Sequence, residues 1–402
     1  MLASLVYGSL MVMGIDVIDM GLATTPTVEM AVTAPNAAGG IILTASHNSG
    51  QWNALKLLNT KGESISANEG TILLEITACD QIVFSGVDEL GKMSGNTEMN
   101  KAHIDTIKRI PLVDTESVSR AGFCVAIDCV NSVGGIIIPQ LLRDLAVKDV
   151  FELYCEPTGI FPHNPEPLPQ NISETSSKMA GLKADVGFIV DPDIDRLVIV
   201  NDDGSMFGEE YTLIALTDYV LGRKPGNTVS NLSATRAVCD ITEKHGGAYT
   251  AAAVGEVNVV EEMKKCNAVT GGEGNGGIFY PDLHYGRDAL EGIALFLSSL
   301  AQSGKKCSDL QKSFPDYFNS KNKLELNEKV DINRLLSIIH EKYRDNPVNT
   351  TDRIRIDFEK EWVHLRKSNT EHVIRMTSEV TTPDKADALS AKIIREVNEI
   401  IA

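Results

Sequence analysis

Three carboxylates occupy alternate positions in one short segment, at Asp191, Asp193 and Asp195, and apolar stretches flank that segment on both sides. In an extended chain alternate side chains point to the same side, so these negative charges should converge on one small volume. Their repulsion would raise their pKa values unless a divalent cation lies among them. Because an all-oxygen ligand set favours Mg²⁺, Mn²⁺ or Ca²⁺ over zinc or copper, the spacing predicts a site for one of these ions.

The calcium-binding EF-hand loop is an alternative interpretation of the same segment, and Asp202 falls at its twelfth position. That loop requires glycine at its sixth position, where this chain has Arg196, and the LVIVN run that follows is typical of a strand. A solvated acidic turn is disfavoured because the segment lies between two apolar strands.

Three further segments carry polar side chains in loops after predicted strands, where α/β proteins bind ligands. In 44–48 (TASHN), a hydroxyl flanked by donors is a candidate nucleophile or phosphate carrier, with a polar turn as the alternative; the serine-hydrolase pattern G-x-S-x-G is absent. Segment 366–371 (RKSNTE) is a donor-rich loop suited to phosphate, or a solvated β-turn. In 271–277 (GGEGNGG), glycines would let the backbone approach a ligand while Glu273 and Asn275 contact hydroxyls, unless it is merely a flexible turn.

The elements that must position these loops alternate between β-branched runs and helical patterns, which is typical of βαβ units with largely parallel sheets. Predicted strands are 15–19, 40–44, 123–128, 186–190, 197–201, 228–231 and 269–271, and predicted helices include 134–145, 209–220, 234–245 and 256–266. Segment 304–327 has few apolar runs and is predicted to be a connection. Beyond it, strands at 353–358, 362–365 and 373–377 and a capped helix at 382–401 indicate a small α+β unit.

Composition narrows the class of protein. With 402 residues, 43% hydrophobic and 23% charged, the chain is globular and long enough for several domains. Its net charge of −18 argues against nucleic-acid or membrane partners, which need a basic face. Seven cysteines without a C-x-x-C pair indicate reduced thiols, and the N-terminal region has no basic segment typical of a signal peptide. We therefore expect a cytoplasmic protein.

The motifs TASHN, DPDIDR, GGEGNGG and RKSNTE, in that order, resemble the four signature loops of the α-D-phosphohexomutases, and AAAVGEVNVVEEM resembles a further segment of that family. The resemblance covers nearly the whole chain. It implies three similar α/β domains with mixed, largely parallel sheets, and a small C-terminal α+β domain, around a central cleft. The domains would be 1–118 for the phosphoserine, 119–223 for the metal, 224–310 for the sugar and 320–402 for a phosphate.

The resemblance also implies a role for each matching residue. Ser46 matches the serine that carries the transferable phosphoryl group, and His47 beside it is counted among the catalytic residues. Lys56 matches the general acid/base, and Arg196 would neutralise phosphate charge. The implied Mg²⁺ ligands are Asp191, Asp193 and Asp195, with an oxygen of phosphorylated Ser46. The implied substrate contacts are Arg236 for the sugar phosphate, Glu273 and Asn275 for sugar hydroxyls, and Arg366, Ser368, Asn369 and Thr370 for the non-reacting phosphate.

The implied activity is intramolecular phosphotransfer between the 6- and 1-positions of a hexose or hexosamine phosphate. Phosphoserine would form a hexose 1,6-bisphosphate, which turns over and returns the other phosphate to Ser46; Mg²⁺ is the implied cofactor, and the Mg²⁺ and Arg196 would lower the pKa of Lys56. The R-x-S-N-T-E and V-G-E forms are most similar to phosphoglucosamine mutases. The alternatives are a phosphomannomutase/phosphoglucomutase and a catalytically silent sugar-phosphate-binding fragment, as a monomer or a homodimer.

The chain departs from the family pattern at several positions. Ser49 replaces a usual proline, Ile194 a usual glycine, and Gly277 a histidine that many bacterial members use as a second acid/base. His284 would replace that histidine only if its loop folds back. The family's S-G-I-R-G and G-R-D segments are missing before the apolar helix at 2–13, so we expect roughly 50–70 residues of the first domain to be absent on a domain-length argument. An uncovered sheet edge and helix, with poor solubility or reduced activity, would follow.

Overall fold

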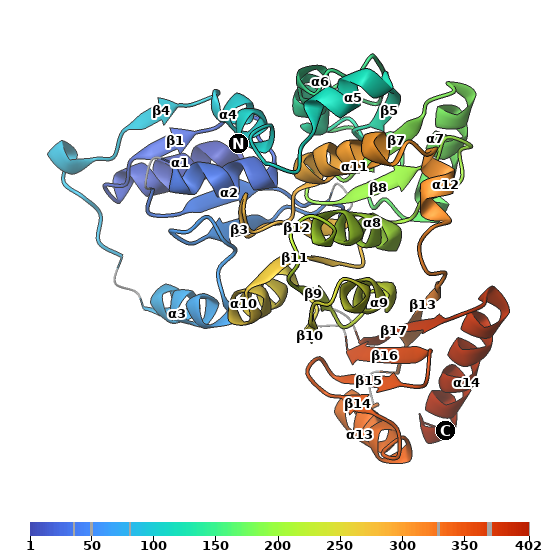
Figure 1. The fold of residues 1–402 in the computed structure, drawn as a ribbon. Helices are drawn as coiled ribbons and strands as arrows, with labels where there is room; N and C mark the ends of the chain where they lie inside the picture. Colours follow the sequence, from blue (N-terminus) through green and yellow to red (C-terminus); the bar gives the residue numbers. More distant parts are fainter. Residues whose placement is uncertain (35–36, 49–50, 80–81, 328–329, 368–371, 402) are drawn as a thin grey trace. The chain divides into compact units, whose positions relative to one another are not determined.

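The computed structural model describes residues 1–34, 37–48, 51–79, 82–327, 330–367 and 372–401 (Figure 1). Its chain forms two compact units, Met1–Thr212 with Gly277–Ser308, and Leu213–Gly276 with Asp309–Ala402. Helices α8 (Glu209–Leu221) and α12 (Cys307–Gln311) run through points where the chain passes from one unit to the other.

The first unit begins with two small sheets. Strand β1 (Val17–Asp19) pairs in parallel with β4 (Met93–Gly95), and β2 (Gly40–Leu43) pairs antiparallel with β3 (Leu55–Leu58). Strand β3 was not among the predicted strands, because four residues are too few for a recognisable alternating pattern. Its helices are α1 (Leu2–Val12), α2 (Thr25–Thr33), α3 (Ala67–Ala78), the 3₁₀ helix η1 (Val87–Glu89) and α4 (Met99–Ile107).

Apolar side chains remain exposed on two of these helices. No residue of α1 or α3 is buried, and Leu5 and Leu74 are 61% and 70% exposed. The apolar helix predicted at 2–13 is therefore present, and its side chains are half-buried or exposed. Within the described ranges, every helix is too short or too polar to cross a lipid bilayer.

A four-stranded mixed sheet also belongs to the first unit, with the order β6 (Asp149–Leu153), β5 (Cys124–Asp128), β7 (Val186–Val190), β8 (Leu197–Val200). Strand β5 is parallel to β6 and β7, whereas β7 and β8 are antiparallel. Every residue of β7 and β8 is buried, so the turn that joins them is anchored at both ends by strands of the core. The remaining elements are α5 (Thr115–Ala121), α6 (Gly134–Asp144), α7 (Pro169–Gly181), β12 (Gly277–Phe279) and α11 (Ala289–Ser303).

The second unit contains three parallel strands, in which β9 (Asn227–Asn231) pairs with β10 (Tyr249–Ala252) on one side and β11 (Ala268–Glu273) on the other. Helices α9 (Ala237–Lys244) and α10 (Glu256–Cys266) connect these strands. The predicted strand-and-helix alternation is confirmed here, and the predicted helix at 256–266 has the bounds of α10.

An antiparallel sheet completes the second unit, with the order β13 (Phe318–Glu325), β17 (Val373–Val380), β16 (Trp362–Lys367), β15 (Ile354–Asp357), β14 (Val348–Asn349). Helices α13 (Ile332–Lys342) and α14 (Pro383–Ile401) share one apolar cluster with its strands. The prediction of a connection over 304–327 was wrong, because β13 pairs with β17 over its whole length. The predicted fold class, α/β with mixed, largely parallel sheets and a C-terminal α+β part, is confirmed, while the domain boundaries remain predictions.

Candidate active site

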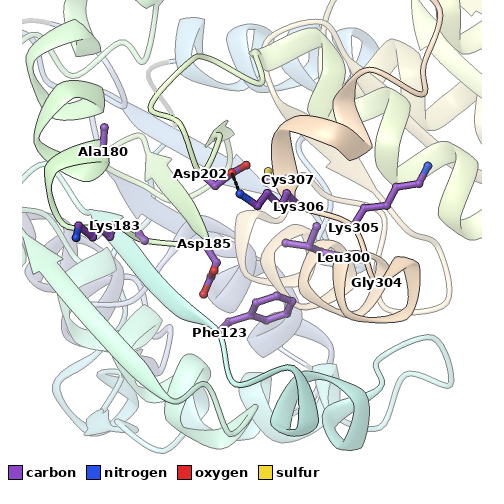
Figure 2. Close-up of a pocket in the computed structure, with 11 residues that line it drawn as sticks. Phe123, Ala180, Lys183, Asp185, Asp202, Leu300, Gly304, Lys305, Lys306 and Cys307 are labelled. Atoms are coloured by element: carbon purple, nitrogen blue, oxygen red, sulfur yellow. Dashed lines mark ion pairs between the residues drawn. The ribbon is translucent and has the colours of Figure 1, made fainter.

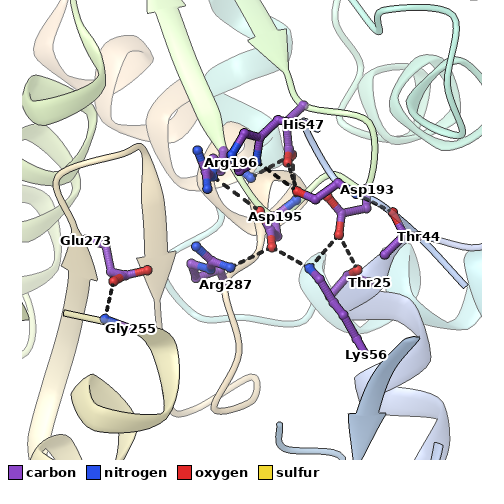
Figure 3. A network of polar contacts seen from close by, with 12 residues as sticks. Thr25, Thr44, His47, Lys56, Asp193, Asp195, Arg196, Gly255, Glu273 and Arg287 are labelled. Atoms are coloured by element: carbon purple, nitrogen blue, oxygen red, sulfur yellow. Dashed lines mark hydrogen bonds and ion pairs between the residues drawn. The ribbon is translucent and has the colours of Figure 1, made fainter. Parts of the chain in front are cut away.

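The acidic triad lies in the turn between β7 and β8 (Figure 3). Ile194 at its centre has φ of 64°, in the left-handed region, so the extended conformation assumed from the sequence was wrong. The predicted convergence is nevertheless confirmed, because Asp191, Asp193 and Asp195 are buried and each offers a carboxylate oxygen within 4.8 Å of the others. The tight turn, rather than strand alternation, brings the charges together.

The triad fits a divalent cation. Among the described residues, Asp193 Oδ1 and Asp195 Oδ1 are buried without a hydrogen-bond partner, which is costly for a carboxylate oxygen. Asp191 Oδ2 accepts a hydrogen bond from Ser46 Oγ at 3.2 Å, which places the predicted phosphoryl carrier beside the triad. Hard oxygen ligands of this kind suit Mg²⁺ or a similar ion. Asp193 Oδ1 and Asp195 Oδ1 are thus the ligand atoms that the protein leaves available.

The triad's carboxyl groups have divergent pKa values. Burial and the neighbouring carboxylates of Asp195 and Asp193 raise the pKa of Asp191 well above its usual range. Burial also acts to raise the pKa of Asp195, but Arg287 and Lys56 outweigh it and hold that pKa below the usual range. The repulsion predicted from the sequence is therefore seen at Asp191 and reversed at Asp195. Because Asp191 carries the uncompensated repulsion, a cation would relieve it most.

Ser46 lies in the loop after β2, in the left-handed region with φ of 49°. Its backbone N–H donates to Thr44 Oγ1 at 2.9 Å, which holds the turn. Its Oγ lies 3.1 Å from His47 Nδ1 as well as within hydrogen-bond distance of the triad. The structure thus brings a hydroxyl, an imidazole and an acidic triad together from segments far apart in the sequence.

His47 lies between Ser46 and charged groups of the first unit. Its Nε2 is 3.8 Å from Glu166 Oε1, and Arg196 Nη1 is 3.9 Å from the same oxygen. Burial, and then the charge of Arg196, lower the pKa of His47 below its usual value. The imidazole is therefore neutral near pH 7 and can accept a proton.

Lys56 reaches the triad from β3, where it pairs with Ile42. Its Nζ donates to Asp193 Oδ2 at 2.5 Å and to Asp195 Oδ2 at 2.9 Å (Figure 3). Burial acts to lower the pKa of Lys56, but the two carboxylates outweigh it and raise that pKa. Without a bound cation the two carboxylates thus determine the pKa of Lys56, and the lowered pKa expected with Mg²⁺ bound remains a prediction.

Two residues that the sequence analysis did not select also hold the triad. Arg287 Nη2 donates to Asp195 Oδ2 at 2.8 Å, and its side chain is only 12% exposed. Thr25 donates from Oγ1 to Asp193 Oδ2 at 2.8 Å and from its backbone N–H to Asp193 O at 3.0 Å. The Thr-Thr-Pro start of α2 is a recognisable helix N-terminus, a signal that could have drawn attention to Thr25. No sequence signal singled out Arg287, which precedes α11.

The predicted sugar-binding residues lie in the second unit. Glu273 ends β11 and is buried, and its Oε1 accepts hydrogen bonds from Asn231 Nδ2 and Gly255 N, both at 3.0 Å (Figure 3). Gly255 has φ of 119°, a conformation that favours glycine. Asn275 lies in the turn that follows β11. The carboxylate of Glu273 is thus fixed in orientation before any ligand binds.

The predicted phosphate contacts also lie in the second unit. Arg236 directly precedes α9, its guanidinium lies 3.7 Å from Asp240, and it lines a pocket together with Arg355. Arg366 is the penultimate residue of β16, with its Nε 2.6 Å from Asp352 Oδ2. Ser368, Asn369 and Thr370, like Ser49, lie outside the described residues. Binding of a phosphate by Arg366 would therefore compete with an existing ion pair.

His284 does not take the place of the family histidine, whose position is occupied by Gly277 in this chain. Its side chain is 11% exposed and lies between Glu29 and Asp288, each at 3.4 Å. The structure therefore places it in a buried ionic cluster instead of beside Ser46.

A pocket in the first unit is separate from the predicted site (Figure 2). It is lined by Phe123, Asp185, Asp202 and Cys307 with three lysines, and within the described part of the chain no predicted site residue lines it. Lys306 lies 3.9 Å from Asp202, so the positive charge there is partly balanced.

Known proteins with similar sequences and folds define the class. Sequence profiles of phosphoglucomutase/phosphomannomutase α/β/α domains I, II and III match residues 1–81, 101–204 and 208–318. A "Phosphoglucomutase/phosphomannomutase" of Thermococcus kodakarensis is 32% identical over 96% of this chain and 84% of its own. A "Probable phosphoglucosamine mutase" of Methanopyrus kandleri is 28% identical over 100% of this chain and 88% of its own.

A solved structure shows the same fold. The crystal structure of a phosphoglucomutase/phosphomannomutase family protein from Burkholderia thailandensis superimposes with a TM-score of 0.84 at 24% identity, over 98% of this chain and 85% of that one. The fold is thus that of repeated α/β/α domains with a C-terminal sheet domain. The chain belongs to the phosphoglucomutase/phosphomannomutase family.

Proposed function

We propose that this chain interconverts the 6-phosphate and the 1-phosphate of a hexose or hexosamine through a phosphorylated Ser46. The observation that carries the proposal is the hydroxyl of Ser46, which lies 3.2 Å from Asp191 and 3.1 Å from His47. A hydroxyl beside an acidic triad and a neutral imidazole is suited to accept and return a phosphoryl group. Membership of a family of hexose-phosphate mutases supports the same reaction.

Asp191, Asp193 and Asp195 would hold a Mg²⁺ ion, which when bound supplies positive charge to the oxygens of the transferring phosphoryl group. Lys56 and Arg287 fix the orientation of Asp195, since both donate to its Oδ2. Arg196, whose backbone N–H donates to Asp191 Oδ1 at 3.1 Å, adds a further positive charge beside the triad. These fixed charges offset the negative charge that accumulates during phosphoryl transfer.

The proton on Ser46 must leave when its oxygen forms the bond to phosphorus. Neutral His47 is the acceptor we assign, because its Nδ1 lies 3.1 Å from Ser46 Oγ and its pKa is lowered by burial and by Arg196. As the new bond forms, the bond between phosphorus and the sugar oxygen breaks, and that oxygen takes a proton to become a hydroxyl. Lys56, whose pKa is raised by the triad, is the cationic donor that we assign to it.

Charge on the C-terminal sheet supports phosphate binding near Arg366. Arg366 pairs with Arg375 in the register of β16 and β17, and Arg375 pairs with Lys323 in that of β17 and β13. Like charges directly opposite each other destabilise a sheet, and an anion beside them would relieve the repulsion. We therefore assign the non-reacting phosphate to Arg366, Ser368, Asn369 and Thr370, a sugar-phosphate contact to Arg236, and the sugar hydroxyls to Glu273 and Asn275.

The substrate that we place first is glucosamine phosphate. The relative from Methanopyrus kandleri is named for that reaction, while the one from Thermococcus kodakarensis is named for glucose and mannose phosphates. The chain should therefore be incubated with Mg²⁺, hexose 1,6-bisphosphate and one of three substrates: glucosamine 6-phosphate, glucose 1-phosphate or mannose 1-phosphate. Highest turnover with glucosamine 6-phosphate is expected, and faster turnover with another sugar would reassign the substrate.

The phosphoryl carrier is tested separately by intact-mass measurement after incubation with hexose 1,6-bisphosphate. One phosphate adduct is expected on the wild-type chain and none on Ser46→Ala, whereas Ser233→Ala, on the second unit, should keep the adduct. An adduct that persists on Ser46→Ala would show that the assigned carrier is wrong. Sugar-phosphate binding without an adduct or turnover on the wild-type chain would favour the silent binding protein.

A further inference from the structure

A second cluster of ionisable side chains lies at the start of α11, apart from the Asp191–Asp195 triad. His284, Asp288 and Glu291 each offer a ligand atom within 4.8 Å of the others. Asp288 and Glu291 are 0% exposed. The proposed phosphoryl transfer makes no use of these three side chains, so their burial needs its own explanation.

Glu291 is the feature that a hydrogen-bond network alone does not explain. Both of its carboxylate oxygens are buried without a hydrogen-bond partner among the described residues. A buried carboxylate is costly unless it is paired, binds a metal or takes up a proton. Burial raises the pKa of Glu291, and so do its acidic neighbours Asp288 and Asp282, whereas His284 acts to lower it. A cation bound at this position would be stabilised by two or more carboxylates.

The geometry of the other two members is that of ligands around a small cation. His284 Nε2 and Asp288 Oδ2 lie 3.4 Å apart, longer than a good hydrogen bond. Two ligand atoms bonded to a tetrahedral zinc ion at about 2.0–2.1 Å lie about 3.3–3.4 Å apart. The observed separation therefore matches one edge of a zinc coordination tetrahedron.

The surrounding residues orient these ligands as metal sites require. Glu29 Oε2 lies 3.4 Å from His284 Nδ1, so one carboxylate faces Nδ1 while Asp288 faces Nε2. A Cβ at Gly286 would overlap Glu29 Oε2, so this carboxylate would have to move if residue 286 carried a side chain. His103 Nε2 lies 2.8 Å from Asp288 Oδ2 and fixes the second ligand.

We propose that His284, Asp288 and Glu291 bind one divalent transition-metal ion of the zinc type. One imidazole and two carboxylates suit zinc better than the all-oxygen triad does. Two of its ligands are fully buried and His284 is 11% exposed, so we assign the ion a structural role. It ties the loop before α11 to the first turn of that helix, and this loop carries Arg287, which holds Asp195.

The competing occupant of the cluster is a proton on Glu291, and zinc content distinguishes the two. The full chain carrying Asp193→Asn, which disables the acidic triad, is expressed with added zinc. It is passed through gel filtration in a weak chelator, and its zinc content is then measured by elemental analysis. One zinc ion per chain is expected. A zinc content well below one ion per chain would overturn the proposal, whatever the chain's mutase activity.

Variants of the cluster locate the ion. Glu291→Gln in the Asp193→Asn background keeps the shape of the side chain and should weaken zinc binding at least about 100-fold, because even outer-shell changes cost 10–100-fold. Glu379→Gln in the same background is the control: it alters another fully buried glutamate and should retain the zinc. Unchanged zinc in the Glu291→Gln chain would overturn the assignment.

A spectroscopic measurement covers the case in which Glu291→Gln does not fold. Co²⁺ replaces zinc in the Asp193→Asn chain, and its visible absorption reports nitrogen coordination and geometry. We expect a tetrahedral spectrum that disappears in His284→Gln, together with a zinc-dependent rise in melting temperature. An octahedral, aquo-like Co²⁺ spectrum in the Asp193→Asn chain would overturn the proposal.

Discussion

Replacing Arg287 by methionine tests how much the triad depends on a residue that the sequence did not reveal. The substitution keeps the apolar stem of a side chain that is 12% exposed and removes its hydrogen bond to Asp195 Oδ2. Removing one partner of a buried ion pair costs about 3–5 kcal/mol when the other charge is left alone. Here Lys56 still donates to the same oxygen at 2.9 Å. We therefore expect a loss of about 1.5–3 kcal/mol, the worth of a hydrogen bond to a charged group.

The pH dependence follows from Asp195. Arg287 and Lys56 lower its pKa in the folded chain, against the effect of burial. A lowered carboxyl pKa contributes stability above the unfolded value, near 4, and that stability is lost as the pH falls through the folded pKa. Between about pH 6 and pH 8 Asp195 is ionised in both proteins, so the difference between wild type and Arg287→Met should be constant.

Hydrogen exchange with mass spectrometry is the assay, because it resolves the two units. A loss of about 1.5–3 kcal/mol should speed exchange about 10- to 150-fold in β7, β8 and the start of α11. Exchange in β16 and β17, which belong to the second unit, should not change. The control is Arg120→Met, which breaks an exposed pair with Glu116 and should cost less than about 1 kcal/mol. Exchange rates in β7 equal to those of the control would refute the argument.

Three further substitutions probe other parts of the fold. Burial acts to lower the pKa of His163, but Asp128 at 2.8 Å outweighs it and raises that pKa. The stabilisation of the folded chain by protonated His163 is therefore full below about pH 6.5 and is lost as the pH rises through the folded pKa. His163→Gln should flatten the fall in unfolding free energy between about pH 6 and pH 9. Arg355 donates to Leu232 O at 2.7 Å while 8% exposed, so Arg355→Lys should cost about 1–3 kcal/mol in urea denaturation, and an unchanged midpoint would contradict this. Gly286→Ala should lower the melting temperature through a loss of about 1–3 kcal/mol, because its Cβ overlaps a buried carboxylate, and an unchanged melting temperature would contradict that overlap.

The parts of the fold predicted from sequence are those with a strong local signal. Strand β7 was predicted with its observed bounds, Val186–Val190, because a continuous β-branched run between turns is typical of a buried strand. Strand β13 was missed because polar residues occupy most of Phe318–Glu325, and its pairing with β17 stabilises it instead of its own hydrophobicity. Pairing partners that lie some fifty residues away leave no local trace in a sequence.

The candidate site shows the same division. Ser46 and the triad could be selected from the sequence because their residue types and spacing indicate a nucleophile and a metal site, and the structure brings them together. The effect of the triad on Lys56 could not be predicted, since it depends on distances of 2.5 and 2.9 Å to two carboxylates. Arg287 escaped notice because a single arginine before a helix has no distinctive pattern. The balance of charges at a site therefore depends on the fold, even when the main residues of the site can be predicted from the sequence.

Ile194 shows which physical term shapes the triad. A β-branched residue in the left-handed region costs about 1–2 kcal/mol, and the sequence pattern alone would favour glycine at this turn. The side chain is fully buried and packs so closely that a Cβ on Gly134 would lie 2.8 Å from its Cδ1. Burial of an isoleucine is worth about 2–5 kcal/mol against truncation, so packing exceeds the backbone strain. The turn that gathers the three carboxylates is thus held by the core beneath it, and this explains why local sequence rules predicted the convergence but not the conformation that produces it.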